Sequence, residues 1–197
     1  MSKYLPVTVA LFIPGILLAV FGLLRPWLEE SMARHMVLEL PGLFCIGWLA
    51  ARACNNTLGR MLAPWNRDGV TVLLAVFLFV SYWMLPSALD LAVLNWDIAT
   101  IKVASLLAAG LLLGATWKES MLVLRAFFVL NWVWMTLTAG FLYRDAPRQL
   151  CAAYLSEQQS DTGLGLIFLA IAVLCLWGAD TYLQANANEM NQRNAID

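Results

Sequence analysis

One short stretch of the sequence combines thioether, imidazole and carboxylate side chains at helical spacing. Positions i, i+3, i+4 and i+7 of one helical face are occupied by Met32, His35, Met36 and Glu39. Methionine sulfur and imidazole nitrogen are soft or borderline ligands that suit copper, Cu(I) above all. We therefore predict a candidate copper site formed by Met32, His35 and Met36. Glu39, one turn after His35, is expected to accept the second ring N–H and fix the tautomer.

The same residues also have a purely structural interpretation. A histidine with a carboxylate four residues later is commonly a hydrogen-bonded pair, and methionine is adaptable packing material. Pro41 lacks a backbone N–H, so it predicts a kink that exposes a carbonyl beside this face. The spacing alone leaves both metal binding and packing open.

A second group of ionisable residues is expected at the same depth. Asp90 ends the third apolar run, Asp97 precedes the fourth, and Lys102 lies about one turn inside it. Pairing is what makes such charges tolerable in a membrane, so we predict a structural Asp90–Lys102 pair. Together with Glu39 these residues would surround the outer-face site. The alternative is that Asp90 and Met84 join the histidine face in one functional site.

The composition indicates that membrane helices hold these residues. The chain is 61% hydrophobic and 13% charged, with a mean hydropathy of +0.73. Soluble domains are about 45–50% apolar and about 25% charged, and disordered chains need low hydrophobicity and high charge. The 12 basic and 13 acidic residues leave no basic surface for nucleic acid. The single histidine excludes haem ligation or catalysis by paired histidines.

Six apolar runs are long enough to cross a hydrocarbon core, which takes roughly 20 residues per helix. The runs are continuous rather than alternating, which favours helices over a barrel. We predict an all-α polytopic membrane helical bundle forming a single transmembrane domain over residues 1–197. Its transmembrane helices are expected at about 5–24, 35–53, 69–89, 98–117, 121–143 and 163–183, followed by a polar, frayed C-terminal tail at 185–197.

Small residues and basic residues add two further expectations. Gly110 and Gly114 form a Gly-x-x-x-Gly in the fourth run, which permits close approach of another helix. Basic residues favour the cytoplasmic side of a membrane protein. With the N-terminus inside, seven of the 12 basic residues lie inside and five outside. We therefore predict that both termini are cytoplasmic.

Three stretches suggest a family. Residues 32–36 lead into a helix with an early proline, residues 84–90 follow, and Lys102 precedes residues 110–117. These stretches, within roughly residues 30–120, resemble the CtaG-like membrane proteins, which are associated with copper delivery to cytochrome c oxidase. The resemblance implies a bacterial inner-membrane protein with copper as its cofactor. It implies that Met32, His35 and Met36 are the candidate copper ligands. Lys102 stands where that family has a histidine, and a protonated lysine does not bind copper.

These patterns predict a protein that is not an enzyme, since HExxH, GxSxG and P-loop motifs are missing from the sequence. The leading hypothesis is copper delivery to, or assembly of, a respiratory or other copper oxidase. One alternative is a structural subunit of a larger membrane complex. A small-molecule transporter ranks last, because only Asn131, Thr136 and Thr138 offer polar groups near the midplane. The expected partners are membrane lipid and subunits of such a complex.

Overall fold

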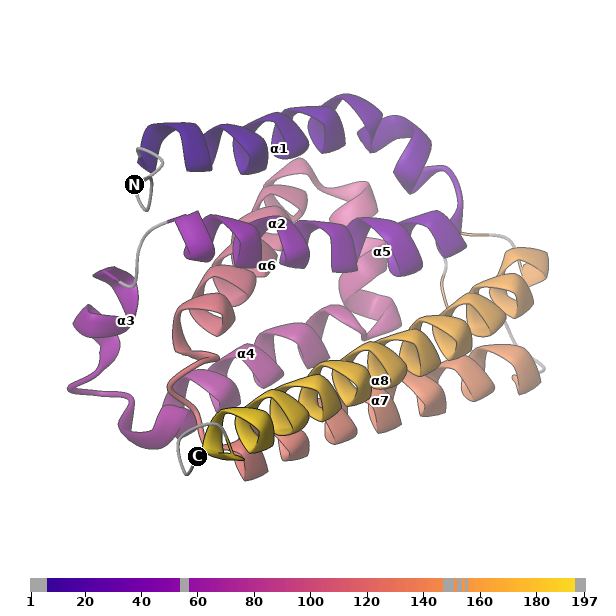
Figure 1. Cartoon of the computed structure of the whole chain (residues 1–197). Coiled ribbons are helices and arrows are strands. Elements are labelled where there is room, and N and C mark those ends of the chain that lie inside the picture. The colour runs from indigo at the N-terminus through magenta and orange to yellow at the C-terminus, as the bar shows by residue number, and fades with distance from the viewer. Residues whose placement is uncertain (1–6, 54–56, 147–150, 152–153, 155, 194–197) are drawn as a thin grey trace.

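The chain folds into a bundle of long helices (Figure 1), in a computed structural model that describes residues 7–53, 57–146, 151, 154 and 156–193. Every regular element in the described part is helical, which confirms the all-α prediction. In chain order the elements are α1 (Val7–Glu29), η1 (Arg34–Glu39), α2 (Leu40–Ala53), α3 (Thr57–Leu62), η2 (Arg67–Gly69), α4 (Val70–Trp83), α5 (Pro86–Leu94), α6 (Trp96–Thr116), α7 (Leu122–Asp145) and α8 (Ser156–Arg193).

Helices long and apolar enough to cross a membrane overlap the predicted runs, although the first continues to Glu29 instead of ending at 24. By length and composition these are Leu11–Glu29, Arg34–Ala53, Trp96–Thr116, Leu122–Asp145 and Gln158–Ala187. The bent pair of α4 and α5 makes a sixth if it is counted as one span. The helix α1 begins, and α8 ends, at the same end of the bundle (Figure 1), as an even number of crossings requires.

The third predicted run, 69–89, is wrong as one straight helix. The helix α4 ends at Trp83 and α5 begins at Pro86, with a bend of 71° between them. Pro86 has no N–H to continue the helical hydrogen bonds, and it disfavours helical geometry at the preceding residue. Leu85 is accordingly extended, at φ −75° and ψ 129°. The proline therefore converts one apolar run into two helices.

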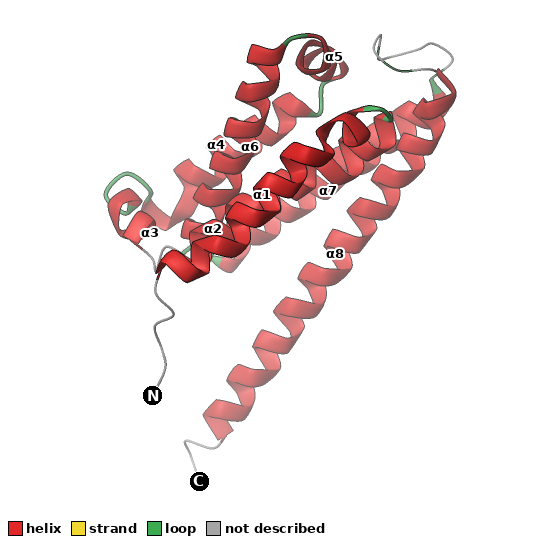
Figure 2. Ribbon diagram, turned by 90° about the horizontal axis from the view of Figure 1, so that it is seen from above, coloured by secondary structure: helices red, strands yellow, loops and turns green. Residues whose placement is uncertain are grey.

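The predicted frayed tail at 185–197 is also wrong over its described part, because α8 continues to Arg193. Residues 184–193 contain no proline or glycine, so nothing in the sequence interrupts the helix. Its 38 residues correspond to about 57 Å, well beyond a hydrocarbon core of about 30 Å. Figure 2 shows this end of α8 extending away from the other helices.

The helices α2 and α6 approach each other closely through glycine. A Cβ added to Gly110 would overlap the carbonyl oxygen of Phe44, and one added to Gly47 would overlap that of Leu107. Gly114 likewise faces side chains of α2. These contacts confirm the role predicted for Gly110 and Gly114, and they add Gly47 as the matching position on the partner helix.

The helices α7 and α8 form a pair that meets the rest of the bundle mainly through η1 and α4. Between this pair and the helices α2, α4 and α6 lies a cavity of about 420 Å³. Its walls are mainly aliphatic and aromatic, and they include Phe44, Trp48, Phe128, Trp132 and Trp177. The contact between η1 and α8 therefore joins the two groups of helices at one end of the bundle.

Candidate functional site

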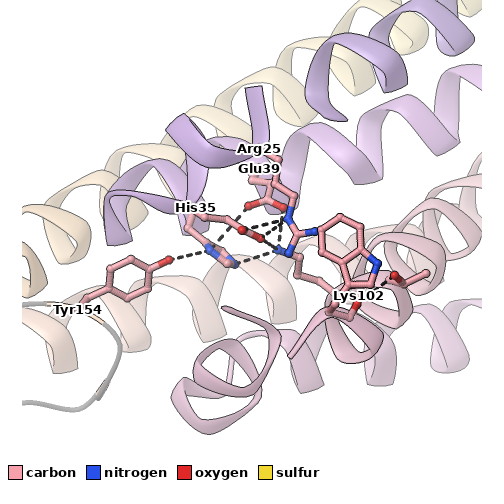
Figure 3. A network of polar contacts seen from close by, with 8 residues as sticks. Arg25, His35, Glu39, Lys102 and Tyr154 are labelled. Atoms are coloured by element: carbon pink, nitrogen blue, oxygen red, sulfur yellow. Dashed lines mark hydrogen bonds and ion pairs between the residues drawn. The ribbon is translucent and has the colours of Figure 1, made fainter. Parts of the chain in front are cut away.

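A buried cluster of charged side chains lies at the end of the bundle where α1, η1 and α6 meet (Figure 3). The Lys102 ammonium nitrogen, on a fully buried residue, lies 2.7 Å from Glu39 Oε1 and 3.1 Å from Glu29 Oε1. It also lies 3.4 Å from His35 Nε2. Arg25 Nε lies 3.0 Å from both carboxylate oxygens of Glu29. Two cations thus face two carboxylates, and the charges of the cluster balance.

Both ring nitrogens of His35 are engaged (Figure 3). A lysine ammonium can only donate, so Nε2 accepts from Lys102 and the ring proton is on Nδ1. His35 Nδ1 lies 2.8 Å from the Tyr154 hydroxyl oxygen, to which it donates. Glu39 Oε2 is 3.7 Å from Nδ1, too far for a hydrogen bond. The prediction that Glu39 accepts the second ring N–H is therefore wrong, because Tyr154 takes that position.

The backbone of η1 explains why these residues do not follow an α-helix. Arg34–Glu39 form a π-helical turn in which the Leu40 N–H bonds to the His35 carbonyl, five residues earlier. The next residue, Pro41, has no N–H to offer to a carbonyl of the preceding turn. The sequence predicts a kink with an exposed carbonyl at Pro41, whereas the structure shows a wide π-helical turn before the proline, of a kind frequent at functional sites.

Met32 and Met36 are buried, as His35 is, each with only 1% of its surface exposed. They belong to an apolar cluster that includes Trp83 and Leu89. The backbone N–H of Met32 donates to the side-chain oxygen of Gln158 at 3.2 Å, which connects this segment to α8. In the structure these methionines therefore act as packing residues, which is one of the two interpretations of the sequence.

The predicted Asp90–Lys102 pair is wrong, because the ion-pair partners of Lys102 among the described residues are Glu29 and Glu39. The charge of Asp90 acts instead on the buried thiol of Cys151. Burial, first, and this carboxylate, second, raise the pKa of Cys151 to about 11.

Asp97 lies outside the charged cluster. It is exposed in the first turn of α6, where its backbone N–H donates to the Asn95 side chain at 2.9 Å. An acidic residue in the first turn interacts favourably with the helix dipole. Asp97 therefore supports the start of α6, the helix that carries Lys102.

Three residues of the cluster were not predicted as site residues: Arg25, Glu29 and Tyr154. The first two form a charged i, i+4 pair at the end of the first apolar run, which was a usable signal. Tyr154 has no such signal, because it reaches His35 across 119 positions of the sequence. Its place depends on how the chain returns between α7 and α8.

The side chains of Glu29, His35 and Glu39 could hold a cation, and the ammonium group of Lys102 occupies the space between them. Glu29, His35 and Glu39 each offer a ligand atom, and these atoms all lie within 4.8 Å of one another. The Lys102 ammonium contacts all three residues, and it takes up the Nε2 lone pair that a metal would need. The residues in this arrangement do not fit a resident copper ion, and copper binding stays a prediction of the sequence.

No family model, curated protein or solved structure matches this chain. The similarity of residues 30–120 to CtaG-like proteins therefore stays a prediction as well.

Proposed function

We propose that this chain is a non-catalytic integral membrane protein that works as an accessory subunit of a larger membrane complex. The observation that carries the proposal is the carboxyl-terminal end of α8, where Met190, beyond the apolar stretch Gln158–Ala187, is 63% exposed and Leu183, near the end of that stretch, is 65% exposed. Leu183, Ala187 and Met190 stand at i, i+4 and i+7, a spacing typical of a helix that packs against another protein. Most helical stability in proteins comes from packing of an apolar face, so a helix end that extends from the bundle with exposed apolar side chains is expected to pack against a partner.

The buried cluster supports a structural role. It connects α1, η1, α6 and Tyr154 through charges that balance, and His35 and Lys102 are fully buried. Arg25 and Glu29 are partly exposed, at 21% and 14% of their side chains, and a substrate would reach His35 or Lys102 only by displacing them. Polar groups closed off in this way fix the arrangement of helices rather than present a reactive side chain.

The proposal places the protein in a bacterial inner membrane, with both termini cytoplasmic and the cluster at the outer face. The distribution of basic residues and the resemblance to CtaG-like proteins support this orientation. In the structure α1 begins and α8 ends at the same end of the bundle (Figure 1), which is compatible with both termini lying on one side of the membrane.

Co-purification from native membranes tests the proposal. The wild type, Leu183→Glu/Met190→Glu and the control Gln184→Glu/Ala185→Glu are purified in mild detergent and their associated proteins identified. The control adds the same charge away from the apolar positions. We expect the wild type and the control to retain the same partners, and the Leu183→Glu/Met190→Glu variant to lose them. A wild type without partners, or equal retention by both variants, would contradict the proposal.

A second candidate function is copper delivery to, or assembly of, a respiratory oxidase. The burial of Met32 and Met36 in the same segment as His35 favours it, and it requires that the Lys102 ammonium move away from His35 Nε2 when the metal binds. Copper content of the purified wild type and a His35→Ala variant tests it. Stoichiometric copper only in the wild type would support this function, and equal, substoichiometric copper in both would remove it.

Transport of a small molecule receives little support from α7. The hydroxyl groups of Thr136 and Thr138 donate to the carbonyls of Trp132 and Trp134 in their own helix. The neighbouring cavity has mainly apolar walls. These residues therefore provide no polar path along the helix, and an accessory role accounts for the bundle better.

A further inference from the structure

The groups around Lys102 are those that proteins use to bind metal ions. Two carboxylates and one imidazole surround a single cationic nitrogen at 2.7, 3.1 and 3.4 Å. The cation comes from α6, whereas its three partners come from α1 and η1. The cluster therefore has the composition of a cation site, filled by a side chain of the protein itself.

The geometry of His35 matches that of a metal-ligating histidine. In such sites one ring nitrogen faces the ion, and the other donates its N–H to an oxygen that fixes the ring. His35 Nε2 faces the ammonium, and Nδ1 faces the Tyr154 hydroxyl at 2.8 Å. The imidazole is thus already oriented with its lone pair toward the centre of the cluster.

One ligand atom of the cluster is unused. Glu39 is 3% exposed, and its Oε2 has no hydrogen-bond partner among the described residues, whereas Oε1 pairs with Lys102. A buried carboxylate oxygen without a donor is costly. The cluster therefore has coordinating capacity beyond what the ammonium uses.

We propose that Glu29, His35 and Glu39 form a cation site in which the ammonium group of Lys102 is the resident cation. The site binds a divalent ion of the zinc class when that ammonium is removed. Without Lys102, the charges of Arg25 (+1), Glu29 (−1) and Glu39 (−1) sum to −1, so a divalent cation is attracted.

Distances limit which ion can replace the ammonium. Zinc binds nitrogen and carboxylate oxygen at about 2.0–2.2 Å, so the three ligands must move inward by roughly 1 Å. Carboxylate and imidazole suit zinc, and three protein ligands leave a fourth position for water. Soft monovalent ions prefer sulfur, which this set of ligands lacks.

Zinc binding by detergent-purified protein tests this inference. The wild type and a Lys102→Met variant, which keeps an unbranched chain of similar size, are dialysed against Zn²⁺ and their bound metal is measured. We expect about one zinc per chain in the variant and far less than one in the wild type. X-ray absorption of the variant should show nitrogen and oxygen ligands.

A third protein separates this site from adventitious surface binding. Lys102→Met/His35→Gln should bind zinc at least about tenfold more weakly than Lys102→Met. Equal binding by the two variants, or no gain of Lys102→Met over the wild type, would overturn the proposal. If Lys102→Met does not fold, Lys102→Gln replaces it, and Zn²⁺ but not Mg²⁺ should raise its thermal unfolding temperature. Failure of Zn²⁺ to do so would equally contradict the proposal.

Discussion

Lys102 shows how a membrane protein keeps a charge in its interior. A charged side chain near the bilayer core is expensive unless it is paired, and here two carboxylates and an imidazole surround it. The rarity of ionisable groups in apolar runs is why the sequence identifies His35, Glu39 and Lys102. Their partners could not be predicted, because the side chains that meet at Lys102 depend on how α1 and η1 pack against α6.

Removing the Tyr154 hydroxyl tests the hydrogen bond that fixes His35. Burial, and next the charges of Glu29 and Glu39, raise the pKa of Tyr154, so this hydroxyl stays neutral. Tyr154→Phe leaves the buried Nδ1–H without an acceptor, and we expect a loss of about 1–3 kcal/mol in unfolding free energy. The measurement is reversible unfolding in mixed micelles. The control Tyr82→Phe, at a half-exposed position, should change little; equal losses would contradict this account.

The thiol of Cys151 provides a test of pH dependence. With its pKa raised to about 11, only about 1 in 1,000 molecules carries the thiolate at pH 8. In a protein with serine at the other three cysteines, labelling by a maleimide should be slow and should accelerate about tenfold per pH unit up to pH 10. Asp90→Asn removes the charge that contributes to the shift and should speed labelling at pH 8. Fast labelling of the folded protein at that pH would be inconsistent with this burial.

At the scale of helices, continuous apolar runs predicted the helices that are long and apolar enough to cross a membrane, because span length follows from membrane thickness. The bend at Pro86 and the wide turn before Pro41 were harder to predict. A proline only removes a hydrogen bond, and the neighbouring helices decide whether the chain bends, kinks or widens. The length of α8 was missed because polar residues suggest a tail although nothing in 184–193 stops a helix.

Adding one methyl group to the glycine contact tests the packing of α2 on α6. Gly110→Ala pushes a Cβ into the Phe44 carbonyl, and we expect it to destabilise the protein by about 1–3 kcal/mol. The matched substitution Gly22→Ala, in α1, meets no atom within 4 Å and should be neutral or slightly stabilising. Unfolding in micelles measures both. Equal effects of the two substitutions would refute close packing at Gly110.

On the scale of the whole molecule, one group of helices containing α1, α2, α4, α5 and α6 meets the α7–α8 pair mainly through η1 and α4. The division of the helices into these two groups could not be predicted from the sequence. The apolar runs have similar hydropathy, and the residues that make contacts between the two groups lie far apart in the chain. The cluster, Met32 and Gln158 all lie near the η1–α8 contact. The end of the molecule that contains the charged cluster is therefore also where η1 connects the first group of helices to the α7–α8 pair.

Orientation in the membrane is a property of the whole molecule and can be measured by labelling. In a cysteine-free protein, Asp97→Cys marks the cluster end and Met190→Cys marks the end of α8; both positions are exposed. We expect a membrane-impermeant maleimide to label the first in intact spheroplasts and the second only after permeabilisation. The reverse pattern would show that the proposed orientation is inverted.

The most direct test of the buried cluster is a double-mutant cycle between Lys102 and Glu39. We expect Lys102→Met alone to lower the unfolding free energy by about 3–5 kcal/mol, since it leaves buried carboxylates without their cation. Adding Glu39→Gln removes one of these charges, so the double variant should be more stable than the sum of the single effects by about 2 kcal/mol. Single effects that add to within about 0.5 kcal/mol would show that the two residues do not interact in the folded protein.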